Sequence, residues 1–223
     1  MLAAPLLVGI VASGPAWVHL PLALFWFAGY LAFHATSLWL KSGRRQRWLP
    51  PVRAYAPAAA LLGAVVALLE PRLLLWVPAF LPPLAVGLWA AAHRHDRDLL
   101  AGLTTVLASA LIAVVAFDAG TTGPLTRGWQ LALVQFLYFG GTVFYVKSAI
   151  REQGRPGFLR LSVAAHGLAT AVATWVSWSL LPVFAALTLR AAVVPGRRPT
   201  PKQIGIAEIV ATVVVSLAAL AVT

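Results

Sequence analysis

The chain has 223 residues, of which 61% are hydrophobic and only 10% are charged. A soluble domain has about 45–50% apolar and about 25% charged residues, so the composition excludes a soluble globular domain. The chain has no Cys, which excludes a disulfide scaffold and a thiolate metal site. Its net charge of +11 is gathered between long apolar runs, where it sets membrane topology, and no nucleic-acid partner is expected.

The apolar runs divide the chain into membrane-spanning segments. A helix needs roughly 20 residues to cross about 30 Å of hydrocarbon, and the runs are continuous, which favours helices over a membrane β-barrel. We predict an all-α, polytopic membrane bundle that forms a single transmembrane domain, 1–223. It has about nine spans, at roughly 1–13, 18–40, 54–70, 72–92, 99–118, 129–147, 159–178, 180–194 and 203–222. The first is too short to cross comfortably, and the fourth should kink or break near its middle at Pro78, Pro82 and Pro83.

The basic residues alternate between connectors. Fifteen of the 17 Lys and Arg follow the second, fourth, sixth and eighth spans, and the other connectors hold only Arg72 and Arg127. The positive-inside rule therefore places the basic connectors and the N-terminus in the cytoplasm and the C-terminus on the extracytoplasmic side. The first 12 residues lack the basic region and the clear cleavage site of a secretory signal.

Polar side chains line one face of four predicted spans. Such side chains are costly in hydrocarbon and usually face the interior of a bundle. Ser and Thr also join helices by local back-bonding, which is the alternative reading of these stripes, and Glu208 also lies close enough to its helix start to favour the helix dipole there. The helical spacing predicts a cavity open to the basic end and lined by Tyr30, His34, Ser37, Gln135, Tyr138, Thr142, Tyr145, His166 and Glu208.

No complete catalytic motif is found in the sequence. There is no Walker A sequence, no G-x-S-x-G, and no carboxylate pair inside a span that would hold Mg²⁺. The segment 93–98 contains two His and two Asp, but its two Arg would repel a cation, so we expect a solvated turn there. His34 and His166 could be axial haem ligands on facing helices, but nothing in the sequence distinguishes them from buried, hydrogen-bonded histidines. We predict no metal and no cofactor, and enzymatic activity stays open without a motif in its favour.

Two basic clusters follow polar-striped helices at the predicted cytoplasmic end. Arg binds phosphate oxygens as a bidentate fork, so two such clusters could clamp a diphosphate or another anionic head group. The alternative is that they serve topology and contact anionic lipid head groups. The candidate anion-binding residues are Lys41, Arg44, Arg45, Lys147 and Arg151.

Four segments together resemble the YwiC-like bacterial membrane proteins. They are 5–9 (PLLVG), 145–152 (YVKSAIRE), His166 in the next span, and 201–209 (PKQIGIAEI). Members of that family typically carry a His-Gly-Ala-Trp-Ala-Met-like segment just before the PLLVG run. The resemblance therefore implies that Met1 is an internal Met of that motif and that residues precede it in the native protein, which agrees with the short first span. It also implies a bacterial inner-membrane location.

The architecture is also similar to that of UbiA-type prenyltransferases, which have nine helices and functional connectors after the second and sixth spans. Their two Asp-rich motifs hold Mg²⁺ on a diphosphate. The corresponding stretches here, 33–37 and 140–144, contain no carboxylate. The resemblance thus implies the fold without the metal-dependent chemistry, since fold does not fix function.

Three functions remain open from the sequence. The first is the binding of a lipid-like or isoprenoid molecule with an anionic head, together with membrane lipids. The second is a small transporter in which His34, His166 and Glu208 are titratable relay groups. The third is a non-catalytic accessory subunit of a membrane complex, whose polar stripes would contact other helices.

Overall fold

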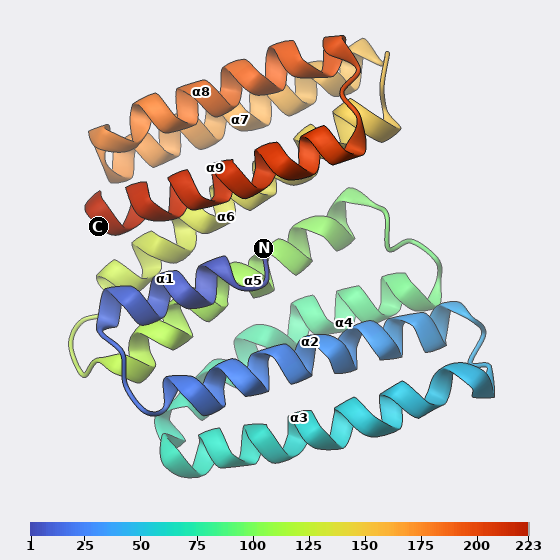
Figure 1. Ribbon diagram of the computed structural model, residues 1–223, viewed down its shortest axis with the longest axis vertical. Coiled ribbons are helices and arrows are strands. Elements are labelled where there is room, and N and C mark those ends of the chain that lie inside the picture. The colour runs from blue at the N-terminus through green and yellow to red at the C-terminus, as the bar shows by residue number, and fades with distance from the viewer. Residues whose placement is uncertain (223) are drawn as a thin grey trace.

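The computed structural model describes residues 1–222, and all of the regular structure within them is helical. This confirms the all-α bundle, and the helix bounds agree with the predicted spans to within about five residues. Successive helices run antiparallel to one another across the view of Figure 1, in the order α1 (Ala4–Ser13), α2 (His19–Lys41), α3 (Leu49–Leu69), α4 (Val77–Ala92), α5 (Leu99–Gly120), α6 (Thr126–Val146), α7 (Pro156–Val176), α8 (Leu181–Val193) and α9 (Pro201–Val222).

Within residues 1–222, eight helical segments are long and apolar enough to cross a membrane. Three of them include short 3₁₀ turns. These extend α3 at Gln46–Trp48, α4 at Pro71–Trp76, and α8 at Trp178–Leu180 and Val194–Arg197. Helix α1 has 10 residues and so reaches only about 15 Å. It runs from the middle of the bundle to one end (Figure 1). The nine predicted spans are therefore eight full-length helices and one half-length helix.

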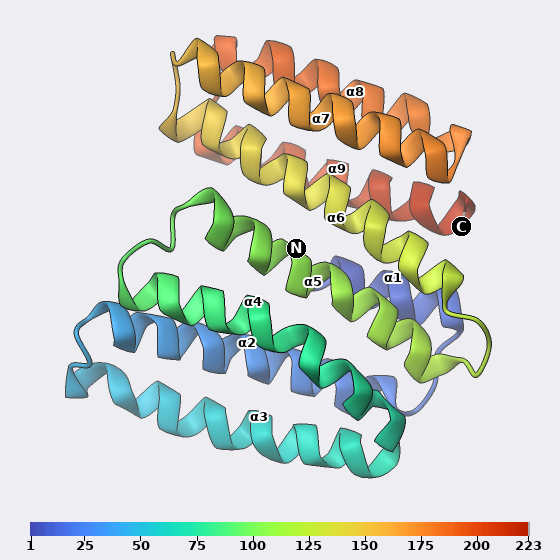
Figure 2. The same ribbon diagram turned by 180° about the vertical axis from the view of Figure 1, so that it is seen from behind.

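The helices form two bodies that meet at α1 and α5. Helices α2, α3 and α4 lie on one side of this seam and α6 to α9 on the other (Figures 1 and 2). Helix α5 is buried on nearly every side between Ser109 and Phe117, whereas α3 buries only Ala59 and Val66. A helix that is apolar all round belongs in the centre of a bundle, so α5 is the core of the molecule.

Gly9 allows α1 to lie close against α5. A Cβ at this position would collide with the main-chain carbonyl of Ala113 and with Ala116. Small residues let helix backbones approach closely in membranes, where dispersion contacts and not water exclusion hold helices together. At the other end of α1, a Cβ on Gly120 of α5 would collide with Ser13, so the seam depends on residues without a side chain.

The prolines of the fourth span, which we expected to kink or break it near its middle, do not break it there. The irregular 3₁₀ turn lies before α4, and α4 continues through Pro82 and Pro83. Pro78 lies in the first helical turn, where its missing N–H has no intrahelical acceptor to lose. Pro82 and Pro83 each remove one helical hydrogen bond, but the remaining turns and the packing against α2 and α5 keep the helix continuous.

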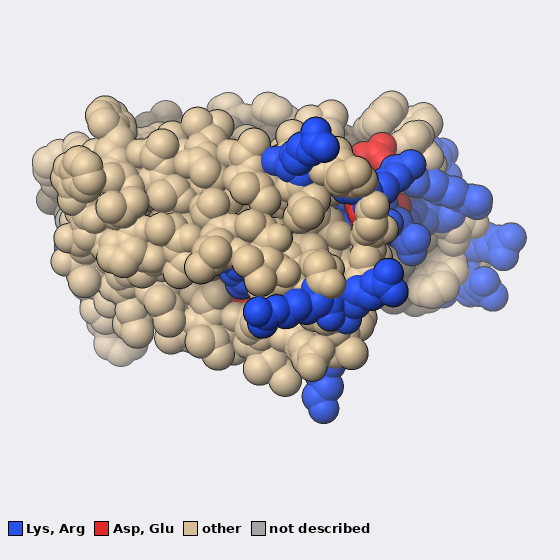
Figure 3. Space-filling view, turned by 90° about the horizontal axis from the view of Figure 1, so that it is seen from above, with Lys and Arg blue, Asp and Glu red and all other residues tan. Residues whose placement is uncertain are grey.

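The four basic connectors lie at one end of the bundle, which we call the basic end. They join α2 to α3, α4 to α5, α6 to α7 and α8 to α9 (Figure 1), and Lys and Arg side chains gather there on the surface (Figure 3). The C-terminus lies at the other, charge-poor end. Trp17, Trp175 and Trp178, in or next to the turns of the charge-poor end, are at least 78% exposed. Exposed Trp at helix ends is typical of the membrane interface.

Candidate functional site

The polar stripe of α2 does not join the other three stripes. Helix α2 packs against α3, α4 and α5, away from α6, α7 and α9. Tyr30 and His34 are exposed and their rings stack at 6.1 Å. The Ser37 hydroxyl is buried and has no hydrogen-bond partner among the described residues. The structure therefore separates Tyr30, His34 and Ser37 from the other predicted cavity-lining residues.

The stripes of α6 and α9 do meet, around the carboxylate of Glu208. The Thr142 hydroxyl donates to Glu208 Oε2 at 2.8 Å, and the Tyr138 hydroxyl lies 3.0 Å from the same oxygen. Tyr138 also lies 3.0 Å from the Thr212 hydroxyl and 3.1 Å from the main-chain carbonyl oxygen of Glu208. Polar groups that have no water to contact must satisfy one another, and here hydroxyls of α6 and α9 do so around one carboxylate.

Arg190 of α8 completes this network. Its Nη1 lies 2.5 Å from Glu208 Oε1, and the two side chains are only 15% and 16% exposed. The N–H bonds of Nη1 do not point along this contact, so the pair is held by charge and not by a directed hydrogen bond. The guanidinium also lies over the Tyr145 ring, 4.3 Å from its centroid. We call Arg190, Glu208, Tyr138, Thr142 and Tyr145 the ionic network.

Sequence reasoning missed the role of Arg190. We counted it among the connector charges of the basic end, but it lies inside α8, one turn before the helix ends. Two signals in the sequence point to a partner. Arg190 follows ten uncharged residues of a predicted span, and Glu208 is the only acidic residue of the predicted span that follows. A lone acid and a lone base in adjacent spans are each too costly to bury without the other.

The remaining predicted residues of this body surround the ionic network. Gln135 is fully buried and donates to the Ser216 hydroxyl at 3.1 Å. His166 is 4% exposed, and its Nδ1 donates to the Ser162 carbonyl oxygen at 2.8 Å. Its Nε2 faces Gly141, where a Cβ would lie 3.0 Å away. The Ser162 hydroxyl is fully buried without a partner in the described part of the chain.

A well-formed cavity lies in the other body, between α2, α4 and α5. Its volume is about 540 Å³, within the range of about 300–1,000 Å³ that is usual for small-molecule sites. Of the nine residues predicted to line a cavity, only Tyr30 lines this one. Its walls are almost entirely apolar and include Phe25, Trp26, Phe33, Trp76, Phe80 and Ile112.

Two aromatic rings packed on glycines shape this cavity. The Phe33 ring lies against Gly87 of α4, and the Phe25 ring lies against Gly63 of α3. Along α2 the cavity extends from Leu22 to Phe33, which places it at mid-depth and toward the charge-poor end. The predicted cavity was to open at the basic end. The difference arises because the polar groups near that end of α6 to α9 pack against one another.

At the basic end, Lys41 and Lys147 approach the same connector. Lys41 Nζ lies 2.7 Å from Asp96 Oδ2, and Lys147 Nζ donates to the main-chain oxygen of Arg97 at 3.3 Å. The hydrogen bond from Lys41 lowers the pKa of the Asp96 carboxyl. Lys147 also opens a π-helical turn, Lys147–Arg151, that ends α6; such turns often occur at functional sites. Two of the predicted anion-binding residues therefore converge.

The other three predicted anion-binding residues, Arg44, Arg45 and Arg151, are exposed at the same end. Arg44 has a positive φ of 61° and follows Gly43, which ends α2 with a φ of 74°. This left-handed turn directs the chain across the basic end and toward α3. The structure thus places all five residues at the basic end, where Lys41 and Lys147 reach the connector between α4 and α5.

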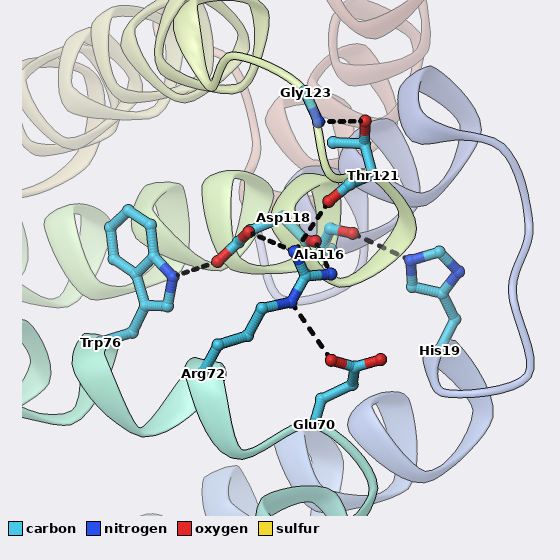
Figure 4. Close-up of polar contacts among 8 residues, drawn as sticks. All are labelled: His19, Glu70, Arg72, Trp76, Ala116, Asp118, Thr121 and Gly123. Carbon is cyan, nitrogen blue, oxygen red and sulfur yellow. Dashed lines mark hydrogen bonds and ion pairs between the residues drawn. The ribbon is translucent and has the colours of Figure 1, made fainter.

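The charge-poor end holds a second polar cluster, around Arg72 (Figure 4). The guanidinium donates to the main-chain oxygens of Asp118 at 2.7 Å and Thr121 at 3.0 Å, and to Glu70 Oε2 at 3.1 Å. Asp118 Oδ2 accepts from Trp76 Nε1 at 2.8 Å. These carbonyls end α5, and a cation is favourable at a helix C-terminus. The cluster ties the turn before α4 to the end of α5.

Arg127 plays a similar part beside α1. Its two terminal nitrogens donate to the main-chain oxygens of Ala12 at 3.1 Å and Leu220 at 3.4 Å, near the ends of α1 and α9. His19 accepts a hydrogen bond from the Ala16 amide at Nδ1 and donates from Nε2 to the Ala116 carbonyl. The two basic side chains of the charge-poor end therefore both bind helix C-termini, and we assign this end a structural role.

Eight apolar spans, a buried ionic network and exposed Trp at the helix ends define a multi-pass helical membrane protein. The family model described as "YwiC-like protein" matches residues 1–117. The "Uncharacterized protein YwiC" of Bacillus subtilis (strain 168) is 32% identical over 218 residues, which cover 94% of this chain and 88% of the relative. The chain belongs to the YwiC-like family.

An "Uncharacterized protein" of Haemophilus influenzae is 27% identical over 212 residues, which cover 94% of this chain and 89% of the relative. Both relatives therefore align along both bodies, whereas the family model ends within α5. No solved structure matches the chain. The similarity to UbiA-type architecture stays a prediction.

Proposed function

We propose that this membrane protein binds a lipid-like or isoprenoid molecule with its apolar tail in the cavity between α2, α4 and α5. The observation that carries this proposal is the cavity of about 540 Å³ with almost wholly apolar walls. Such a cavity offers nothing to a polar ligand, and each CH₂ buried there contributes about 0.8 kcal/mol. Leu74, Leu81 and Leu84 line the cavity and are also exposed, so a tail can enter from the surrounding lipid.

The anionic head of this molecule would lie at the basic end, held by Lys41, Arg44, Arg45, Lys147 and Arg151. Lys41 and Lys147 already face one connector from two sides. Phe33, at the near end of the cavity, lies eight residues before Lys41, which is about 12 Å along a helix. The tail must therefore extend past Phe33 before it reaches the cavity. With the basic end in the cytoplasm of a bacterial inner membrane, the head would belong to the inner leaflet.

The test is native mass spectrometry of the protein extracted gently from its own membrane. We expect a stoichiometric polyprenyl or quinone-like species to copurify. Ala108 lines the cavity from α5, and Ala108→Phe should fill it and abolish copurification. Ala60→Phe on the exposed face of α3 is the matched control and should leave the bound species in place.

The head-group residues are tested separately with Lys147→Gln. If the head lies at the basic end, this variant should weaken binding without changing topology. A bound species that survives Ala108→Phe would place the ligand outside the cavity. Bulk phospholipid alone in the wild-type protein would contradict the proposal and favour a transporter or an accessory subunit.

The ionic network favours a second candidate function, a small transporter with titratable relay groups. Glu208 and His166 lie in the body formed by α6 to α9, close enough for their charges to interact. His34 is exposed on α2, in the other body. Ionisable groups inside a membrane bundle often mark ion or proton pathways. Proton-driven uptake into vesicles that carry the protein, lost on Glu208→Gln, would support this candidate.

A further inference from the structure

The buried guanidinium of Arg190 has more donors than partners. A guanidinium has five N–H donors, yet Nε, Nη1 and Nη2 are all buried and none makes a directed hydrogen bond to a described residue. Glu208 offers it one oxygen by charge contact, because Thr142 and Tyr138 engage the other. The Tyr145 ring covers one face of the guanidinium and leaves its edge available. Unused donors on a buried arginine are costly, so this edge fits an acceptor from outside the chain.

We propose that Arg190 is the anchor of a binding site for a small carboxylate inside α6 to α9, and that the anion binds together with a proton on Glu208. A planar carboxylate matches one edge of a guanidinium bidentately, through two parallel N–H···O bonds. The buried Ser162 hydroxyl, also without a partner in the described residues, is a further donor on the neighbouring helix α7. This site is separate from the lipid cavity and does not depend on it.

Charge balance requires the proton. The Arg190–Glu208 pair is neutral as it stands, so an anion that entered alone would leave one negative charge unbalanced inside the bundle. An unbalanced buried charge is strongly unfavourable. When Glu208 takes up a proton, the anion replaces its carboxylate as the partner of Arg190 and the site is neutral again. By linkage, anion and proton then strengthen each other's binding.

The hydroxyls around Glu208 suit both of its protonation states. With Glu208 ionised, Tyr138 and Thr142 donate to Oε2. With Glu208 protonated, Tyr138 can turn its own proton to the main-chain oxygen of Glu208 at 3.1 Å. Its oxygen then accepts the proton of the carboxyl group, because a phenol is both donor and acceptor.

Other titratable groups face Glu208 from the elements packed around it. They are Tyr138 and Tyr145 of α6, His166 of α7, Arg190 of α8 and the amino group of Met1 before α1. Glu208 is the only carboxylate among them, so the one-proton exchange is assigned to it. The site lies nearer the basic end, where Arg197, Arg198 and Lys202 raise the local concentration of anions.

The test uses the full chain in lipid nanodiscs with acetate as the probe. Binding is followed by NMR line broadening of ¹³C-acetate, and proton uptake by an indicator dye in weak buffer. We expect one proton per acetate bound and an affinity that falls about tenfold per pH unit on the alkaline side. Chloride, which has the charge without the planar fork, should compete only weakly.

Variants separate the two partners. Glu208→Gln should bind acetate with no proton uptake and no pH slope, and acetate should raise its thermal stability. The double variant Arg190→Gln, Glu208→Gln has no lone buried charge to unfold it, and it should lose binding entirely. Arg155→Gln disrupts an exposed ion pair with Glu152 at the same end and should behave as wild type. Acetate bound without proton uptake in the wild type, or no acetate bound by either the wild type or Glu208→Gln, would overturn the proposal.

Discussion

The two bodies of this molecule differ in the polarity of their interiors and in how tightly those interiors are packed. Helices α2 to α5 keep their interior apolar and leave a cavity of about 540 Å³ beneath aromatic rings. Helices α6 to α9 place an arginine, a glutamate and several hydroxyls inside and close around them. In lipid a buried charge is tolerated only with a partner, which demands tight, directed packing, whereas an apolar wall tolerates empty space. The contrast teaches that polarity and free volume are alternatives within one helical topology.

The largest expected effect comes from breaking the ionic network on one side. Glu208→Ala leaves Arg190 as an uncompensated buried charge and should lower the free energy of unfolding by about 3–5 kcal/mol. The double variant Arg190→Met, Glu208→Leu removes both charges and should recover most of that loss. Denaturant unfolding in detergent micelles measures both. A loss below about 1 kcal/mol for Glu208→Ala would mean that water already reaches the pair and that the two bodies differ less than we infer.

The comparison is sharpened by placing the same large side chain in each body. Ala173 of α7 is fully buried, and Ala173→Phe should cost at least about 1–3 kcal/mol through overpacking. Ala108 faces the cavity, so Ala108→Phe should change the free energy of unfolding by less than about 1 kcal/mol in either direction. The same micelle assay compares them. Equal losses at the two positions would show that the cavity is not available to a side chain.

The sequence predicted where the helices lie along the chain, but it did not predict which side chains meet between helices. Apolar runs set the spans, and the boundary error at the start of α3 arose because Pro50 and Pro51 are suited to a first helical turn. The Arg190–Glu208 pair was not predicted, because a basic residue near the end of a span is ordinarily interpreted as a topology signal. The cavity escaped because it depends on where Phe33 and Phe25 meet glycines of other helices. Such contacts are tertiary, and no local pattern carries them.

A smaller effect is expected at the charge-poor end, where Arg72 and Arg127 bind main-chain oxygens at the C-termini of helices. Arg72→Ala removes hydrogen bonds to the main-chain oxygens of Asp118 and Thr121 and should cost about 1–2 kcal/mol. Arg160→Ala at the basic end is the control, because Arg160 is exposed and makes no polar contact within residues 1–222. It should stay within about 0.5 kcal/mol of wild type. If the two variants lose equally, Arg72 serves topology alone and not the end of α5.

The smallest effect is expected at the ion pair between Lys41 of α2 and Asp96 in the connector between α4 and α5. The Lys41 hydrogen bond lowers the pKa of Asp96 in the folded protein, so the pair stabilises the fold above the pKa of an unfolded Asp. This contribution is lost as the pH falls through the lower, folded value. The pair is about one-third exposed, which limits it to about 0.2–1 kcal/mol.

Asp96→Asn should therefore destabilise the protein slightly at neutral pH and not at all in acid, and added salt should shrink the difference. Thermal unfolding in detergent between about pH 3 and 7 measures this dependence. Asp98→Asn, on the exposed neighbour that pairs with His95, is the matched control. If Asp96→Asn instead stabilises the protein at neutral pH, the folded protein is more stable without the Lys41–Asp96 ion pair. An anionic head group would then be its better partner, and the two bodies would share one basic surface in place of two separate interiors.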